Sequence, residues 1–136
     1  MSAVRGETTG GDTLRKLVLD PAALIANLTL AREWAPPGSR VRAMVKANAY
    51  GHGLDELLEV FAEHADELGV ATLEEGLRIR SHASPGVPVF LVSGEKDWGN
   101  RSYFEALREA GLVPAVSSVD ELRVLVEQIG GAVHFP

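Results

Sequence analysis

The sequence predicts an α/β fold built from parallel strand–helix units. Short apolar runs with β-branched residues alternate with amphipathic stretches about five times, at intervals of roughly 20–25 residues, as in βαβ units. The chain has 136 residues, of which 46% are hydrophobic and 24% charged, as is typical of a globular domain with its own core. Alternation of this kind fits either an open doubly wound sheet or a (β/α)8 barrel.

The first elements are read from local signals. Residues 1–15 lack apolar periodicity and predict a flexible N-terminal segment, and residues 16–19 predict a short strand. Asp20 and Pro21 have the pattern of a helix N-cap followed by proline at the first helical position. The helix is predicted to end before the Pro-Pro-Gly segment at 36–38.

A lysine stands at the end of the next predicted strand, residues 41–46. Because side chains alternate along a strand, Met44 and Lys46 are expected on one face. Lys46 is followed by a loop in which Gly51 and Gly53 allow the backbone to approach a ligand closely. An amine whose stem lies on apolar surface is poorly solvated when charged, and this favours the free amine that a Schiff-base lysine requires. A solvent-directed lysine at a strand end is the alternative.

The remaining elements alternate regularly. Strands are predicted at 69–71, 87–92, 112–116 and 132–135. Helices are predicted at 55–67, 72–82, 103–110 and 118–129. Two of these helices begin with the spacing of a capping box, formed by Thr72 with Glu75 and by Ser118 with Glu121.

Composition excludes several classes of function. The net charge of −6 argues against a nucleic-acid surface or an anionic membrane as partner. The chain has no cysteine, and its histidines lack the spacing of metal ligands, so no metal site is expected. Neither a signal peptide nor an apolar run of membrane-spanning length is present in the sequence, which makes a cytoplasmic protein the expectation.

The string Val45-Lys46-Ala47-Asn48-Ala49-Tyr50-Gly51-His52-Gly53 resembles the pyridoxal-phosphate attachment motif of the alanine racemases. A related valine-lysine-alanine-asparagine core occurs in other fold-type III enzymes, including amino-acid decarboxylases, but the continuation through 50–53 is similar to the racemase branch. Residues 69–80 resemble the next strand and helix of that family. The resemblance runs from about Leu17 to Pro136.

The resemblance implies the barrel, because alanine racemases have an N-terminal (β/α)8 TIM-type barrel followed by a mostly β domain. A complete barrel takes roughly 250 residues. The expectation is therefore that residues 16–136 are an incomplete barrel domain, the first half of a TIM-type barrel, truncated after about five strands and preceded by the flexible segment 1–15.

The resemblance also implies a chemistry. Lys46 matches the lysine that holds pyridoxal 5'-phosphate as a Schiff base and acts as proton acceptor on one face, the D-alanine side. Tyr50 matches the tyrosine whose hydroxyl reaches the cofactor phosphate. The family isomerises L- and D-alanine, which supplies peptidoglycan, and works as a homodimer. Its opposite-face base is a tyrosine of the partner subunit's C-terminal domain with no counterpart in this sequence, so the isolated fragment is expected to be inactive.

Alternatives remain at this stage. A racemase of broader amino-acid range and a non-catalytic pyridoxal-phosphate-binding barrel protein share the lysine and its barrel. His52 is expected to order the loop. Asn48 is expected to bond either the loop backbone or a neighbouring group of the site. Glu75 is explained by helix capping.

Overall fold

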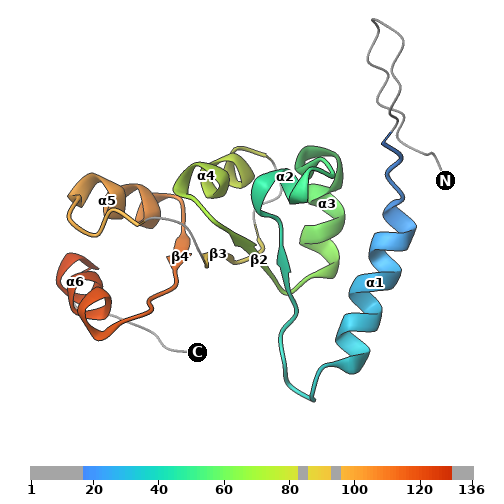
Figure 1. The fold of residues 1–136 in the computed structure, drawn as a ribbon, viewed down its shortest axis with the longest axis horizontal. Helices are drawn as coiled ribbons and strands as arrows, with labels where there is room; N and C mark the ends of the chain where they lie inside the picture. Colours follow the sequence, from blue (N-terminus) through green and yellow to red (C-terminus); the bar gives the residue numbers. More distant parts are fainter. Residues whose placement is uncertain (1–16, 83–85, 93–95, 130–136) are drawn as a thin grey trace, which may run out of the picture.

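The computed structural model describes residues 17–82, 86–92 and 96–129. Parallel strands and helices alternate through these ranges (Figure 1). The strands are β1 (Arg42–Met44), β2 (Glu67–Val70), β3 (Val89–Leu91) and β4 (Leu112–Pro114). The helices are α1 (Pro21–Trp34), α2 (Lys46–Tyr50), α3 (Leu54–His64), α4 (Leu73–Ser81), α5 (Arg101–Glu109) and α6 (Val119–Ile129). No helix within these ranges has the length and apolarity needed to cross a bilayer.

The strand order decides between the two architectures that the sequence allows. The described strands pair in parallel in the order β1-β2-β3-β4, which is also their order along the chain. A doubly wound sheet reverses its strand order at a switch point, whereas a barrel wall adds each strand beside the previous one. The α/β prediction is confirmed, and the sequential order is that of a TIM-type barrel wall.

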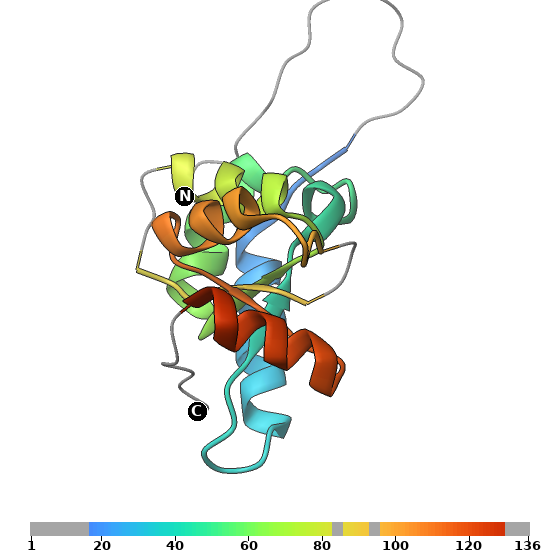
Figure 2. The ribbon, with the colours of Figure 1, turned by 90° about the vertical axis from the view of Figure 1, so that its left-hand side faces the viewer.

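The helices cover one face of this sheet. Helices α3, α4 and α5 lie side by side over it, and α1 packs beside α3 (Figures 1 and 2). The row of paired residues that faces these helices is fully apolar and buried: Ala43, Leu68, Val89 and Leu112. Burial of this row against the helices is the main source of stability in the domain.

The opposite face corresponds to the inside of a barrel. Its paired row is Met44, Gly69, Phe90 and Val113, and the Val113 side chain remains 43% exposed. Gly69 leaves room in this row for the Met44 side chain, because a Cβ at its position would overlap the sulfur of Met44 unless that side chain moved. The Met44 side chain therefore lies against Gly69 of the neighbouring strand.

Some of the helix and strand boundaries predicted from the sequence agree with the structure and others differ from it. Asp20 caps α1, since its Oδ1 accepts hydrogen bonds from the Ala22 and Ala23 amides at 3.0 and 3.1 Å. The strand predicted at 16–19 is wrong for residues 17–19, which have no regular structure. Exposure there is high, 61% for Leu17 and 71% for Val18. The predicted segment 1–15 and the predicted strand 132–135 lie outside the described residues.

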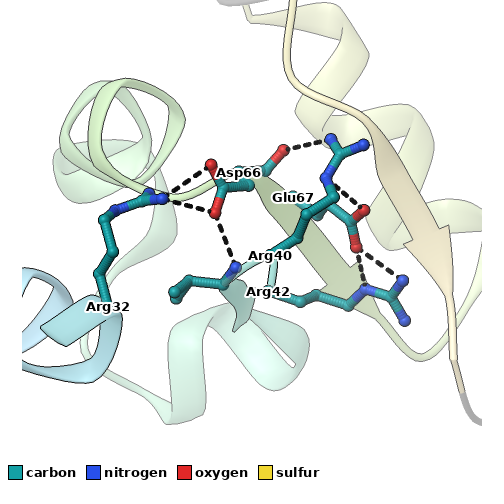
Figure 3. A network of polar contacts seen from close by, with 6 residues as sticks. Arg32, Arg40, Arg42, Asp66 and Glu67 are labelled. Atoms are coloured by element: carbon teal, nitrogen blue, oxygen red, sulfur yellow. Dashed lines mark hydrogen bonds and ion pairs between the residues drawn. The ribbon is translucent and has the colours of Figure 1, made fainter. Parts of the chain in front are cut away.

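The helix predicted to reach residue 67 ends at His64, because Glu67 begins β2 and Asp66 binds the segments beside it. Asp66 accepts two hydrogen bonds from Arg32, at 3.0 and 2.9 Å, and one from the Val41 amide at 2.7 Å (Figure 3). Its carbonyl oxygen accepts a further bond from Arg40 at 3.2 Å. Asp66 thus joins α1 to the start of β1.

Glu67 occupies the neighbouring position on the inner face and is 7% exposed. Its carboxylate pairs with Arg42 at 2.6 Å and with Arg40 at 3.0 Å (Figure 3). The guanidinium carbon of Arg42 lies 3.8 Å from the centroid of the Phe90 ring. A buried carboxylate requires such partners, because an unpaired one would be costly in this environment.

Replacing Asp66 tests this end of the sheet. The Val41 amide and Arg32 hold the pKa of Asp66 below its ordinary value of 3.8. The carboxylate therefore stabilises the fold above pH 3.8, and its contribution is lost as the pH falls through the lowered folded pKa. We expect Asp66→Asn to lower the free energy of unfolding by about 1 kcal/mol at pH 7, with the difference from wild type closing below pH 3.8, measured by urea titration.

Asp120→Asn is the matched control, since Asp120 pairs with Arg123 at 3.2 Å but is 89% exposed. This change is expected to alter stability by only a few tenths of a kcal/mol. Equal effects of the two substitutions, or a difference at Asp66 that does not depend on pH, would contradict the prediction.

Candidate functional site

The structure places Lys46 at the carboxyl end of β1. The Val45 amide continues the ladder by donating to the Gly69 carbonyl oxygen at 2.8 Å, and Lys46 follows directly as a half-buried residue. In barrels of parallel strands, this is the end at which active sites lie. Lys46 therefore lies at the carboxyl end of β1, although the strand predicted at 41–46 is shorter and ends at Met44.

The segment after Lys46 is a left-handed helical turn. Although short and helical, α2 has positive φ angles of 51–56° at Ala47, Asn48, Ala49 and Tyr50. Left-handed backbone costs about 1–2 kcal/mol for each residue with a Cβ. The sequence predicted a loop here, and the handedness was not foreseen. A run of such residues persists only when surrounding contacts hold it.

Hydrogen bonds within the segment help to stabilise this left-handed conformation. The Ala49 amide donates to the Val45 carbonyl and the Gly51 amide to the Ala47 carbonyl, both at 2.9 Å. The turn ends through two glycines that also have positive φ, 83° at Gly51 and 93° at Gly53. Ala49 is only 4% exposed, so its methyl group is anchored in the core.

The roles of Asn48 and His52 follow from these contacts. The Oδ1 atom of Asn48 accepts from the Leu54 amide at 3.0 Å, so Asn48 caps α3, whose own N-cap residue Gly53 has no side chain to do so. His52 places Nδ1 2.7 Å from the Ala49 carbonyl oxygen, which accepts the ring N–H. Both side chains bond the loop backbone, which is one of the two roles expected for Asn48 and the role expected for His52.

Tyr50 returns toward the lysine. The Nζ atom of Lys46 lies 6.0 Å from the centroid of the Tyr50 ring, and Tyr50 is 59% exposed. Lys96, which is also half-buried, lies 5.9 Å from the ring of Trp98. A lysine beside an aromatic ring is therefore not distinctive in this chain. What distinguishes Lys46 is the strand end and the left-handed turn.

Glu75 makes a contact in this region that sequence reasoning missed. It forms the predicted capping box with Thr72, but its Oε1 atom also accepts from the Ala47 amide at 2.7 Å. Its Oε2 atom accepts from the Ala71 amide at 2.7 Å. The capping-box pattern explains only the bond that the same Oε2 atom accepts from the Thr72 amide at 3.3 Å, and neither the Ala47 nor the Ala71 contact. Neighbouring parallel strands end at one edge of the sheet, and this was the available signal that 47 and 75 would meet.

A cavity of about 350 Å³ lies behind the turn. It is bounded by the start of α1, by α3 and by one side of the turn, with Tyr50 and His52 among its lining residues. Lys46 is not among them. The two site residues inferred from the sequence are therefore near each other, but only Tyr50 borders this cavity.

Comparisons with known proteins agree with this geometry. The family model described as alanine racemase, N-terminal domain, matches residues 19–133. The alanine racemase of Legionella pneumophila (strain Corby) is 48% identical over 66 residues, which make up 48% of this chain and 18% of that protein. The matched residues thus span about a fifth of the length of this relative.

Solved structures are similar over most of the chain. The alanine racemase from E. faecalis has a TM-score of 0.67 at 27% identity, covering 80% of this chain and 28% of that one. A histidine racemase from Leuconostoc mesenteroides has a TM-score of 0.64 at 26% identity, covering 82% of this chain and 28% of that one.

The strain in the turn can be measured. Glycine adopts positive φ without the Cβ penalty, so Ala47→Gly is expected to raise the free energy of unfolding by about 1 kcal/mol. The matched control is Ala26→Gly at an exposed position in the middle of α1. Glycine is unfavourable in a right-handed helix, so this change should lower the free energy of unfolding by about 1 kcal/mol. Urea unfolding of both variants should give opposite signs, and destabilisation by both would argue against a left-handed conformation at Ala47.

Proposed function

We propose, given that this chain belongs to the family of alanine racemase N-terminal domains, that it provides the lysine half of a site that interconverts L- and D-alanine. The observation that carries the proposal is a lysine at the carboxyl end of the first barrel strand, held by a left-handed turn with the sequence of the racemase motif. The activity of the whole protein, which is several times longer in the relatives, belongs to this proposal.

The residues present fit pyridoxal phosphate. In the part of the chain that the structure describes, no carboxylate lies within ion-pair distance of Lys46, so its amine is not committed to a salt bridge. The exposed Tyr50 offers a phenolic hydroxyl from the same turn. Lys46 would hold the cofactor covalently and Tyr50 would bond its phosphate. When bound, the cofactor supplies an electron sink that acidifies the Cα–H of an amino acid.

Lys46 then acts as an acid–base group. Its Nζ atom takes the Cα proton on the D-alanine side and returns it. Racemisation also needs a group on the opposite face. Following the family, we assign this to a tyrosine of a second subunit in a homodimer, and we assign the D-alanine product to peptidoglycan.

A racemase with a broader range of amino acids is the second candidate. The observation that favours it is the likeness to the Leuconostoc histidine racemase, whose TM-score of 0.64 is close to the 0.67 of the E. faecalis alanine racemase. Barrel geometry at this level is shared by both. Substrate choice is therefore decided by the assay described below.

Covalent attachment is the first test. The chain contains only three lysines, Lys16, Lys46 and Lys96. Incubation with pyridoxal 5'-phosphate, reduction with borohydride and peptide mapping should place most of the label on Lys46. Lys96 is the internal reference, because it is equally half-buried and equally close to an aromatic ring. Equal labelling of Lys46 and Lys96 would remove the basis for the assignment.

Proton exchange tests the chemistry without needing the opposite-face base. In D2O with the cofactor, the chain should exchange the Cα hydrogen of D-alanine faster than that of L-alanine, followed by proton NMR. Lys46→Ala should reduce the rate roughly 100-fold, to the level of the free cofactor, because the positioned base is gone. Comparable exchange of D-histidine would favour the broader racemase. A wild-type rate no higher than that of Lys46→Ala would contradict a catalytic role.

A further inference from the structure

Two glutamates in this chain make the same kind of link between neighbouring loops. Glu75 and Glu121 both stand in the first turn of a helix, α4 and α6. Each carboxylate reaches back to the amide four residues earlier, at Ala71 (2.7 Å) and Ser117 (2.6 Å). Each carboxylate also accepts a hydrogen bond from the loop after the preceding strand of the sheet, which is β1 for Glu75 and β3 for Glu121. The two glutamates differ in the donor that this loop supplies.

The donor to Glu121 is a side chain, whereas the donor to Glu75 is a backbone amide. The Nε1 atom of Trp98 donates to Glu121 at 3.1 Å. The amide of Ala47 donates to Glu75 at 2.7 Å. That amide belongs to the peptide group joining Lys46 to Ala47. A carboxylate bonded to it fixes the plane of this peptide and with it the backbone from which the Lys46 side chain departs.

The need for such a fixed point follows from the strain of the turn. In the part of the chain that the structure describes, the other hydrogen bonds of residues 47–53 have their partners within residues 45–54, and the Val45 amide, which bonds Gly69, precedes the turn. They stabilise the shape of the turn but do not join it to a neighbouring βα unit. The bond from Ala47 to Glu75 does, and a carboxylate acceptor makes it one of the stronger kinds of hydrogen bond.

We propose that Glu75 is a positioning residue for Lys46. Its one carboxylate both caps α4 and binds the Ala47 amide, and it thereby fixes the left-handed turn after Lys46 relative to the unit formed by β2 and α4. The inference rests on the proposed function of Lys46 as the amine that holds the cofactor. Glu75 itself does not touch the reacting atoms. Its carboxylate is pre-oriented by the bonds to Ala71 and Thr72, so little is left to order when the cofactor binds.

Glu75→Gln is the most informative substitution. Glutamine keeps the shape, but its NH2 group must face one of the backbone donors at Ala47 or Ala71, so one of these bonds is lost. The control is Glu121→Gln, which disturbs the equivalent cap far along the sheet from Lys46. The measurement is the ratio of borohydride-fixed pyridoxal phosphate on Lys46 to that on Lys96 at limiting cofactor, with circular dichroism to confirm folding.

The expected result is a roughly tenfold fall of the Lys46 to Lys96 ratio in Glu75→Gln, the size of effect for one charge-assisted hydrogen bond. Glu121→Gln should leave the ratio within roughly twofold of wild type, as for a distant site. A folded Glu75→Gln with an unchanged ratio would show that Glu75 only caps α4, and would overturn the inference. Failure of wild type to label Lys46 would instead count against the proposed function.

A second measurement needs neither cofactor nor variant. Native-state hydrogen exchange of wild type should show the Ala47 amide strongly protected, because its proton is bonded to Glu75 although the residue is exposed to solvent. Protection supports the anchoring even if Glu75→Gln fails to fold or the labelling fails. Exchange of the Ala47 amide at the rate of an unstructured peptide would overturn the inference independently.

Discussion

The left-handed turn from Ala47 to Tyr50 is the constraint on which the site depends. It follows Lys46, which lies just beyond the end of β1. Because a helical turn of either hand places residue i+4 near residue i, it brings the centroid of the Tyr50 ring to 6.0 Å from the lysine amine. The conformation is unfavourable for alanine, so its persistence requires the core position of Ala49, the cap from Asn48 to Leu54 and the bond to Glu75. Lys46 and Tyr50 thus lie close together because these contacts hold the backbone between them in the left-handed conformation.

The two ends of the sheet carry different kinds of polar contact. At the amino ends of β1 and β2, Asp66 and Glu67 bind arginines from α1 and β1 and fix the strands relative to each other (Figure 3). At the carboxyl ends, glutamates at the starts of α4 and α6 bind the neighbouring loops. Parallel pairing makes both possible, because all strands begin at one edge and end at the other. The ion pairs of Asp66 and Glu67 thus lie at one edge and Lys46 at the other, where active sites of barrels lie.

Local signals in the sequence were sufficient for much of this. The Asp20 cap, the capping box at Thr72, the cap of α6 by the Ser118 hydroxyl and the position of Lys46 after a buried strand were predicted, since each depends on residues close in the chain. The Glu121 carboxylate bonds Ser117 and not the Ser118 amide that a full capping box would use. The left-handed turn was not predicted, because alanine carries no preference for positive φ. The end of α3 at His64 and the Glu75 to Ala47 bond depend on partners about 25 residues away, and residues 17–19 lack the strand that their composition predicts.

A crystal structure of the chain, reduced with borohydride in the presence of pyridoxal 5'-phosphate, tests the central claim most directly. The claim is that the strained turn presents Lys46 and Tyr50 to one cofactor. It predicts continuous electron density from the Nζ atom of Lys46 to the cofactor, with the phosphate against the Tyr50 hydroxyl and positive φ retained at residues 47–50. Cofactor density on Lys96 instead, or a turn that rearranges to right-handed backbone around the bound cofactor, would contradict it.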